Sequence, residues 1–274
     1  MELIVFDLDG TLLDASAAIS PYTRETLARL SERGILYTVA TGRALHASRD
    51  ILHGHGFRLP QAYKNGVLIW NPTREDYTHH NFLTLPDIRH VLEAVLAQGV
   101  TPFLLTLEPR NEHAIYHPPL KTEAEFQLAE SFRARSGVRV LPAAALPADA
   151  EITNVSALGS AHAIDAVARL IEHEPDLVAY HGPAIEGNEL KWIDIHHKRA
   201  SKGNAVDVLR RELGASRVLC FGDADNDLSM FAAADEAYAP ENASAEVRSA
   251  ATAVIGHHDE DGIARFLRER FDLD

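Results

Sequence analysis

Two short acidic stretches carry the residues best suited to chemistry in this 274-residue chain. Asp7 and Asp9 follow directly on the apolar run 3–6. The second stretch, 222–227, reads Gly-Asp-Ala-Asp-Asn-Asp and follows the apolar run 218–221. Carboxylates serve in proteins as nucleophiles, as general acids or bases, and as ligands of hard cations. Both stretches therefore indicate acid–base, nucleophilic or metal chemistry.

The second stretch favours a cation. Three aspartates within five residues raise one another's pKa, and a divalent ion with oxygen ligands, such as Mg²⁺, relieves that repulsion. From Asp223 to the end the chain has thirteen acidic residues and four arginines, within a formal net charge of −14. A charge of this sign repels nucleic acid and anionic membrane surfaces, so we expect neither as a partner.

Two basic or hydroxyl-bearing segments could complete a site for an anion. Thr41, Gly42 and Arg43 follow the apolar run 35–39, where a hydroxyl and backbone N–H groups can meet an anion. Lys202 precedes a helical pattern. Taken alone, helix capping by Thr41 and a solvated Lys202 are the simpler interpretations. Their positions near strand ends are what favours a common site.

The elements that must position these residues alternate as in a parallel α/β sheet. The patterns predict a strand at 3–6, a helix at 21–32, a strand at 35–39 and, near the C-terminus, a helix at 203–213, a strand at 218–221 and a helix at 227–234. Short apolar runs without polar alternation are typical of strands buried on both faces. Ligands bind at the carboxyl ends of such strands, which is where the acidic stretches lie. No G-x-G-x-x-G follows the first strand, which disfavours a dinucleotide-binding oxidoreductase.

The middle of the chain predicts a second domain. Apolar residues at helical spacing over 88–95 precede strand-like runs, and the same order returns from 164 onward. A further helix is expected near 121–136. This doubled helix–strand–strand order suits an open, mostly antiparallel sheet with helices on one face. We place this α+β domain at 83–189, inserted into a doubly wound core made of 1–82 and 190–274.

The chain resembles the haloacid dehalogenase-like phosphatases, and within them the Cof-type group with a C2B-type cap. The resemblance rests on five ordered motifs: Asp7-x-Asp9-Gly10-Thr11, Thr41-Gly42-Arg43, Asn65-Gly66, Lys202-Gly203 and Gly222-Asp223-x-x-Asn226-Asp227. Each motif is common by itself, whereas the ordered set is specific and covers the whole chain. The resemblance implies a Rossmann-like catalytic core and an inserted cap that selects the substrate.

The resemblance also implies roles for the motif residues. Asp7 is the expected nucleophile, forming an aspartyl-phosphate, and Asp9 the expected general acid and base. Thr41 and Lys202 are expected to bind the transferring phosphoryl oxygens. Further contacts with phosphate or substrate are expected from Thr11, Gly42, Arg43, Asn65 and Asn226.

A magnesium ion is the cofactor that the resemblance implies. The expected ligands are the Asp7 carboxylate, the Asp9 backbone carbonyl and Asp223, with Asp227 holding a coordinated water. The ion offsets repulsion between the nucleophile and a phosphate dianion.

Fifteen histidines, including the pairs 79–80, 196–197 and 257–258, raise a transition-metal alternative. Adjacent residues in a strand point to opposite faces, so we interpret these pairs as solvated surface histidines.

We therefore expect a Mg²⁺-dependent phosphatase acting on phosphomonoesters of small metabolites, above all sugar phosphates. A phosphosugar mutase of the same superfamily and a non-catalytic phosphate-binding module stay open as alternatives. The only cysteine, Cys220, lies in an apolar run, and the N-terminus has no basic leader, so we expect a cytoplasmic protein. We expect a monomer or weak homodimer whose partner is a small phosphate ester.

Overall fold

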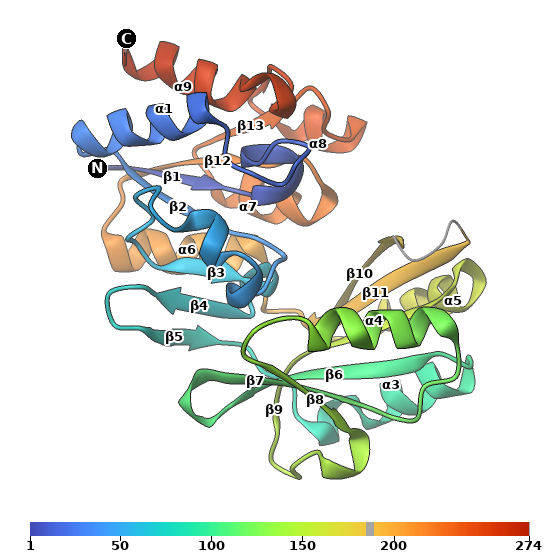
Figure 1. Cartoon of the computed structure of the whole chain (residues 1–274). Coiled ribbons are helices and arrows are strands. Elements are labelled where there is room, and N and C mark those ends of the chain that lie inside the picture. Colours follow the sequence, from blue (N-terminus) through green and yellow to red (C-terminus); the bar gives the residue numbers. More distant parts are fainter. Residues whose placement is uncertain (185–188, 274) are drawn as a thin grey trace. The chain divides into compact units, whose positions relative to one another are not determined.

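The structure is a computed structural model that describes residues 1–184 and 189–273 (Figure 1). The chain divides into two compact units. The first comprises Met1–His80 and Ala200–Asp274, and the second comprises Asn81–Arg199. Among the described residues, no helix combines the length and apolar character that crossing a bilayer requires.

The first unit is built on a five-stranded parallel sheet in the order β14-β13-β12-β1-β2. Its strands are β1 (Glu2–Phe6), β2 (Leu36–Val39), β12 (Arg217–Phe221), β13 (Glu236–Pro240) and β14 (Ala253–Ile255). Its helices are α1 (Pro21–Glu32), α2 (Arg49–Leu52), α6 (Lys202–Leu213), α7 (Leu228–Ala233), α8 (Ala245–Ala250) and α9 (Gly262–Phe271). This confirms the predicted doubly wound, Rossmann-like core.

Both faces of this sheet are covered, as the unalternated apolar strands predict. On β1, Ile4 and Phe6 pack in one apolar cluster with α1 and α9, which lie side by side (Figure 1). Leu3 and Val5 pack in a second cluster with residues of α6 and α7 on the opposite face. Cys220 lies in that second cluster and is fully buried.

A small antiparallel sheet extends the first unit beyond β2. It contains β3 (Gln61–Tyr63), β4 (Leu68–Asn71) and β5 (Asp76–His80), and an isolated bridge joins Ala40 to Ala62. The turn between β3 and β4 carries Asn65 at a positive φ of 54°. Next to it, a side chain on Gly66 would place its Cβ 2.3 Å from the Ser201 carbonyl oxygen, so this turn packs against the start of α6.

The second unit has a six-stranded sheet in the order β10-β11-β9-β6-β7-β8. Its strands are β6 (Thr101–Glu108), β7 (Glu112–His117), β8 (Val138–Pro142), β9 (Glu151–Ser160), β10 (Leu177–Pro183) and β11 (Leu190–His197). Its helices are α3 (Leu85–Ala97), α4 (Glu123–Arg133) and α5 (Ala161–Ile171). All strand pairs are antiparallel except β7 with β8. The helix–strand–strand order occurs twice, as α3-β6-β7 and α5-β10-β11.

Two details of this unit differ from the sequence-based expectation. Helices cover both faces of the sheet: Leu104 packs with α3 and α5, whereas its neighbours Phe103 and Leu105 pack with α4. The prediction of helices on one face was therefore wrong, because the apolar residues of β6 serve two cores. The predicted boundary at 189 also falls before β11, which pairs with β9 and β10 and so belongs to the second unit.

Candidate active site

The carboxyl ends of two neighbouring strands bring the two acidic stretches together. Asp7 follows β1, and its N–H donates to the Phe221 carbonyl at the end of β12 at 2.9 Å. Asp223 lies two residues beyond that same strand. Carboxylate oxygens of Asp7, Asp223 and Asp227 all lie within 4.8 Å of one another. Parallel pairing of β1 with β12 thus joins residues 216 positions apart in the chain.

Lys202, the first residue of α6, is fully buried between two of these acids. Its Nζ lies 2.7 Å from Asp7 Oδ1 and 2.6 Å from Asp227 Oδ1. The helix is capped by the Ser201 hydroxyl, which accepts from Asn204 N at 3.1 Å. This cap fixes where α6 begins, and with it the position of the lysine. The interpretation of Lys202 as a solvated surface residue is therefore wrong.

Asp227 holds the second acidic stretch in shape. Its Oδ2 accepts from the backbone N–H groups of Asp223 at 2.9 Å and Ala224 at 3.0 Å. A Cβ on Gly222 would lie 2.5 Å from the Asp227 Cγ, so only glycine permits this close approach. With Lys202 bound at Oδ1, both oxygens of this buried carboxylate are engaged.

Electrostatics in this cluster are unbalanced. Burial raises the pKa of Asp7 to about 8; Lys202 opposes this rise, and the charges of Asp227 and Asp223 add to it. Burial also raises the pKa of Asp223, although the hydrogen bond from Thr11 opposes it. Burial lowers the pKa of Lys202, but Asp227 and Asp7 outweigh it and hold the pKa above its ordinary value. One ammonium group thus faces three carboxylates.

The donor set fits a magnesium ion. It consists of carboxylate oxygens, the ligands that this hard cation prefers, and it carries more negative charge than Lys202 neutralises. Asp7 is buried but offers a second oxygen besides the one that contacts Lys202, and Asp223 is only partly buried. A divalent cation would therefore relieve the repulsion among these carboxylates, which adds to the effect of burial on the pKa of Asp7.

Gly10 and Thr11 orient Asp223. The Thr11 hydroxyl donates to Asp223 Oδ1 at 2.7 Å and is almost fully buried, so the structure directs this predicted phosphate-binding residue towards the acid. Gly10 has a φ of +69°, and a Cβ there would lie 2.4 Å from Asp223 Oδ2. The loop after β1 thus passes directly against the carboxylate of the second stretch.

Gly10→Ala is expected to weaken Mg²⁺ binding by tenfold or more, because the added methyl group must displace Asp223. Gly34→Ala is a matched control, since Gly34 has the same φ of +69° but nothing within 4 Å of an added Cβ. In both variants an alanine must adopt a left-handed backbone conformation, which costs about 1 kcal/mol. Only the first variant also disturbs the carboxylate cluster. Isothermal titration with Mg²⁺ measures the difference; equal affinities in the two variants would contradict this role of Gly10.

The remaining predicted site residues lie in the neighbouring loops. The Thr41 hydroxyl is almost fully buried and accepts from Arg43 N at 3.1 Å. Asn226 Nδ2 donates to Asn65 Oδ1 at 2.9 Å, and a Cβ on Gly42 would lie 3.3 Å from that same oxygen. The loops after β2, β3 and β12 therefore meet at this edge of the sheet.

Asp9 is paired away from the carboxylate cluster. Its Oδ2 accepts from Arg43 Nε at 2.7 Å, and its Oδ1 accepts from Arg43 Nη2 at 2.5 Å. The Asp9 side chain is 58% exposed, whereas that of Arg43 is 22% exposed. The two residues thus form a bidentate ion pair at the solvent-facing side of the loop after β1.

Two turns near the C-terminus, one after β13 and one after β14, brace this loop, and sequence reasoning missed them. Asn242 Nδ2 donates to the Gly10 carbonyl at 2.7 Å, and Asn242 Oδ1 accepts from His258 N at 3.2 Å. His258 Nδ1 donates to the Leu13 carbonyl, also at 2.7 Å. No motif marks Asn242 or His258, because their partners are backbone atoms far away in the sequence.

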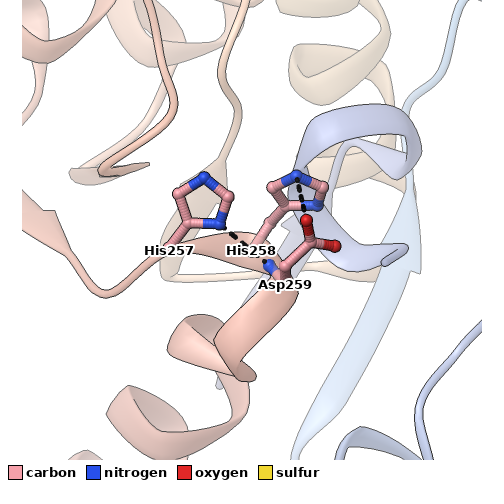
Figure 2. Close-up of side chains that lie close together, drawn as sticks. All are labelled: His257, His258 and Asp259. Carbon is pink, nitrogen blue, oxygen red and sulfur yellow. Dashed lines mark hydrogen bonds and ion pairs between the residues drawn. The ribbon is translucent and has the colours of Figure 1, made fainter. Parts of the chain in front are cut away.

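Figure 2 shows His257, His258 and Asp259 in the turn after β14, close enough to suggest a metal site. The ring nitrogen Nδ1 of His257 accepts from Asp259 N at 3.2 Å, and Asp259 Oδ1 accepts from Ala15 N. These contacts give the turn a structural role. The His258 side chain is only 14% exposed, and His196 is also buried, so the interpretation as solvated histidines was wrong for these two residues.

Two curated relatives of this chain are phosphatases by name. Pyridoxal phosphate phosphatase YbhA of Escherichia coli is 29% identical, with 97% of each chain covered. The 5-amino-6-(5-phospho-D-ribitylamino)uracil phosphatase YwtE of Bacillus subtilis is 27% identical, again with 97% of each covered.

Among solved structures, a haloacid dehalogenase-like hydrolase from Bacteroides thetaiotaomicron has a TM-score of 0.77 at 23% identity and covers 98% of this chain and 99% of its own. The structure of the subclass IIB sugar phosphatase BT4131 has a TM-score of 0.76 at 20% identity, with both chains fully covered. These likenesses show a shared fold. The sequence profile of the haloacid dehalogenase-like hydrolases matches residues 4–267, so the chain belongs to this family, as its ordered motifs indicate.

Proposed function

We propose that this protein is a Mg²⁺-dependent phosphatase that hydrolyses phosphomonoesters of small metabolites, above all sugar phosphates, through an aspartyl-phosphate. The observation that carries the proposal is the contact of the buried Asp7 with Lys202 inside a cluster of three carboxylates. A nucleophilic carboxylate, a fixed cation and a set of hard oxygen ligands then lie at one strand end. The two relatives named above act, by their names, on small phosphorylated compounds.

In this mechanism Asp7 attacks phosphorus in line, and the ester oxygen leaves. Lys202 holds the Asp7 carboxylate in place and stabilises negative charge on the phosphoryl oxygens. Asp9 donates a proton to the leaving oxygen and then takes one from the water that hydrolyses the aspartyl-phosphate. Alkyl alkoxides are poor leaving groups, so an acid at this position contributes directly to the first step.

Other residues at the carboxyl end of the sheet hold Asp7, Asp9 and Lys202 in place. Mg²⁺, held by the carboxylates of Asp7 and Asp223 and the backbone carbonyl of Asp9, would supply positive charge against the phosphate dianion. Asp227 keeps the second acidic stretch in place through Asp223 N and binds Lys202. Thr41, Gly42, Asn65 and Asn226 are proposed to contact the phosphoryl group or its ester oxygen.

We propose further that the second unit selects the substrate. The second unit is inserted between the two halves of the first unit in the sequence, which supports this assignment. The sequence of a separate unit can change while the catalytic residues of the first unit stay the same. An inserted unit of this kind could also exclude water from the site while Asp7 attacks phosphorus. We expect exchange of residues 81–199, the whole second unit, with those of a relative to change substrate preference and to leave aryl phosphate hydrolysis in place.

The test is phosphate release from a panel of sugar phosphates, pyridoxal phosphate and an aryl phosphate, with Mg²⁺ and with EDTA. The expected result is Mg²⁺-dependent release of inorganic phosphate from at least one alkyl ester, and a loss of at least about 10²-fold with EDTA. Transfer of the phosphoryl group to a second sugar hydroxyl, with no free phosphate, would identify a mutase. Binding of sugar phosphates without any turnover would identify a binding module and overturn the proposal.

A further inference from the structure

The bidentate pair of Arg43 and Asp9 places the proposed acid in an arrangement that does not suit proton transfer. Each Asp9 oxygen accepts one short hydrogen bond from the Arg43 guanidinium, at 2.7 and 2.5 Å. Fork-to-fork contacts of this kind are strong and geometrically specific. The guanidinium engages a lone pair on each oxygen and so holds the carboxylate turned towards Arg43. Catalysis through Asp9 therefore requires this pair to separate.

Arg43 is the anchored member of the pair. Its N–H donates to Thr41 Oγ1, its carbonyl accepts from Lys64 N at 2.9 Å, and its Nη1 donates to the Ala47 carbonyl at 3.3 Å. The Asp9 side chain, by contrast, is 58% exposed and makes no hydrogen bond to any other described residue. When the pair separates, Asp9 is thus the side chain that turns away.

The freed guanidinium would lie within electrostatic reach of the nucleophile. The hydrogen bond from Asp9 raises the pKa of Arg43 above its ordinary value, burial opposes this, and the charges of Asp9 and Asp7 both add to the rise. A phosphate dianion carries more charge and more acceptor oxygens than one carboxylate, so it competes well for the same fork. An ester bound at Asp7 is therefore a suitable replacement for Asp9.

We propose that Arg43 is a positioning residue that holds Asp9 while no substrate is bound and exchanges it for the phosphoryl oxygens of the ester. Two N–H donors of the guanidinium leave Asp9 and donate to the phosphate, and no covalent bond changes in the exchange. Asp9, freed at the solvent-facing side of the loop, takes from water the proton that it later donates to the leaving oxygen, so it becomes available as the acid only when an ester occupies the site. This inference rests on the proposed function, because it assigns Asp9 the role of acid.

A double-mutant cycle on the binding of inorganic phosphate in the presence of Mg²⁺ tests the exchange without requiring turnover. The four proteins are the native chain, Asp9→Ala, Arg43→Gln and the double variant, and titration calorimetry gives each dissociation constant. Removing the negative charge of Asp9 tightens phosphate binding in both backgrounds. Competition for Arg43 adds to this effect only where Arg43 is present, by about fivefold for a pair of this exposure.

The expected result is therefore a tightening by Asp9→Ala that is about fivefold larger in the native background than in the Arg43→Gln background. Equal tightening in both backgrounds overturns the proposal. Asp9→Asn keeps the shape of the side chain and serves as a second variant should the alanine disturb the loop. Thermal unfolding of all variants checks that each is folded.

Turnover kinetics provide a second readout, which substitution of a merely structural residue would not change in the same way. In Arg43→Gln, KM is expected to rise for both an alkyl and an aryl phosphate, while the ratio of their kcat values does not fall. A selective loss of kcat on the alkyl ester would mean that Arg43 aligns Asp9 for catalysis, and would overturn the exchange. Absence of Mg²⁺-dependent hydrolysis by the native protein would instead refute the proposed function, and the binding cycle distinguishes the two failures.

Discussion

Asp7→Asn is expected to abolish Mg²⁺-dependent phosphate release, with kcat lowered by about 10⁴-fold or more. The amide has the shape of the carboxylate but is not a nucleophile, so no aspartyl-phosphate forms. Losses of this size are typical when the nucleophile of a covalent mechanism is removed, because the remaining groups act only in concert with it. Release of inorganic phosphate from the best ester of the panel measures the effect.

The substitution is not expected to unfold the protein. Lys202 keeps its contact with Asp227, and the change removes one of three carboxylates from a crowded cluster. Without Mg²⁺, Asp7→Asn should therefore unfold at a Tm no lower than that of the native chain, since burial and neighbouring acids raise the pKa of Asp7.

A matched control makes the same chemical change elsewhere in the first unit. Asp50→Asn lies in α2 on an exposed side chain, and we expect native kcat from it. If Asp7→Asn kept more than about one hundredth of native turnover in a Mg²⁺-dependent reaction, another residue would have to be the nucleophile.

The convergence of the acidic stretches was predictable from the sequence because it follows from backbone geometry. Asp7 and Asp223 each come after an apolar run without polar alternation, and such runs form neighbouring parallel strands whose carboxyl ends share one edge. The burial of Lys202 in the site was harder to predict, because a lysine at a helix start is usually solvated. Its burial depends on how α6 packs over the sheet, which no local pattern specifies.

Other contacts could not be predicted, for a different physical reason. The pairing of Arg43 with Asp9 depends on side-chain rotamers, and the bracing of Gly10 by Asn242 joins residues 232 positions apart through a backbone carbonyl. Neither leaves a periodic trace in the sequence. Likewise, β6 is apolar at successive positions, and only the structure shows that Leu104 and Phe103 serve opposite faces.

Lys202→Met is expected to be the most destabilising single change at the site. The methionine fills a similar volume, but Asp7 and Asp227 lose their shared ammonium group and are left buried and unpaired. Removing one partner of a buried ion pair costs about 3–5 kcal/mol. At about 2–4 °C per kcal/mol for a chain of this size class, Tm should fall by on the order of 10 °C in EDTA.

Mg²⁺ should restore part of this loss, because a divalent cation at the same carboxylates replaces the missing positive charge. Turnover should not recover with it, since Lys202 also fixes the nucleophile and binds the transferring oxygens. Lys121→Met, at an exposed lysine, is the control and should leave Tm and kcat unchanged. A Lys202→Met protein whose Tm matches the native value in EDTA would show that the ammonium group does not offset the charge of the cluster. Recovery of Tm by Mg²⁺ without recovery of kcat would separate the structural and the catalytic contributions of one buried lysine.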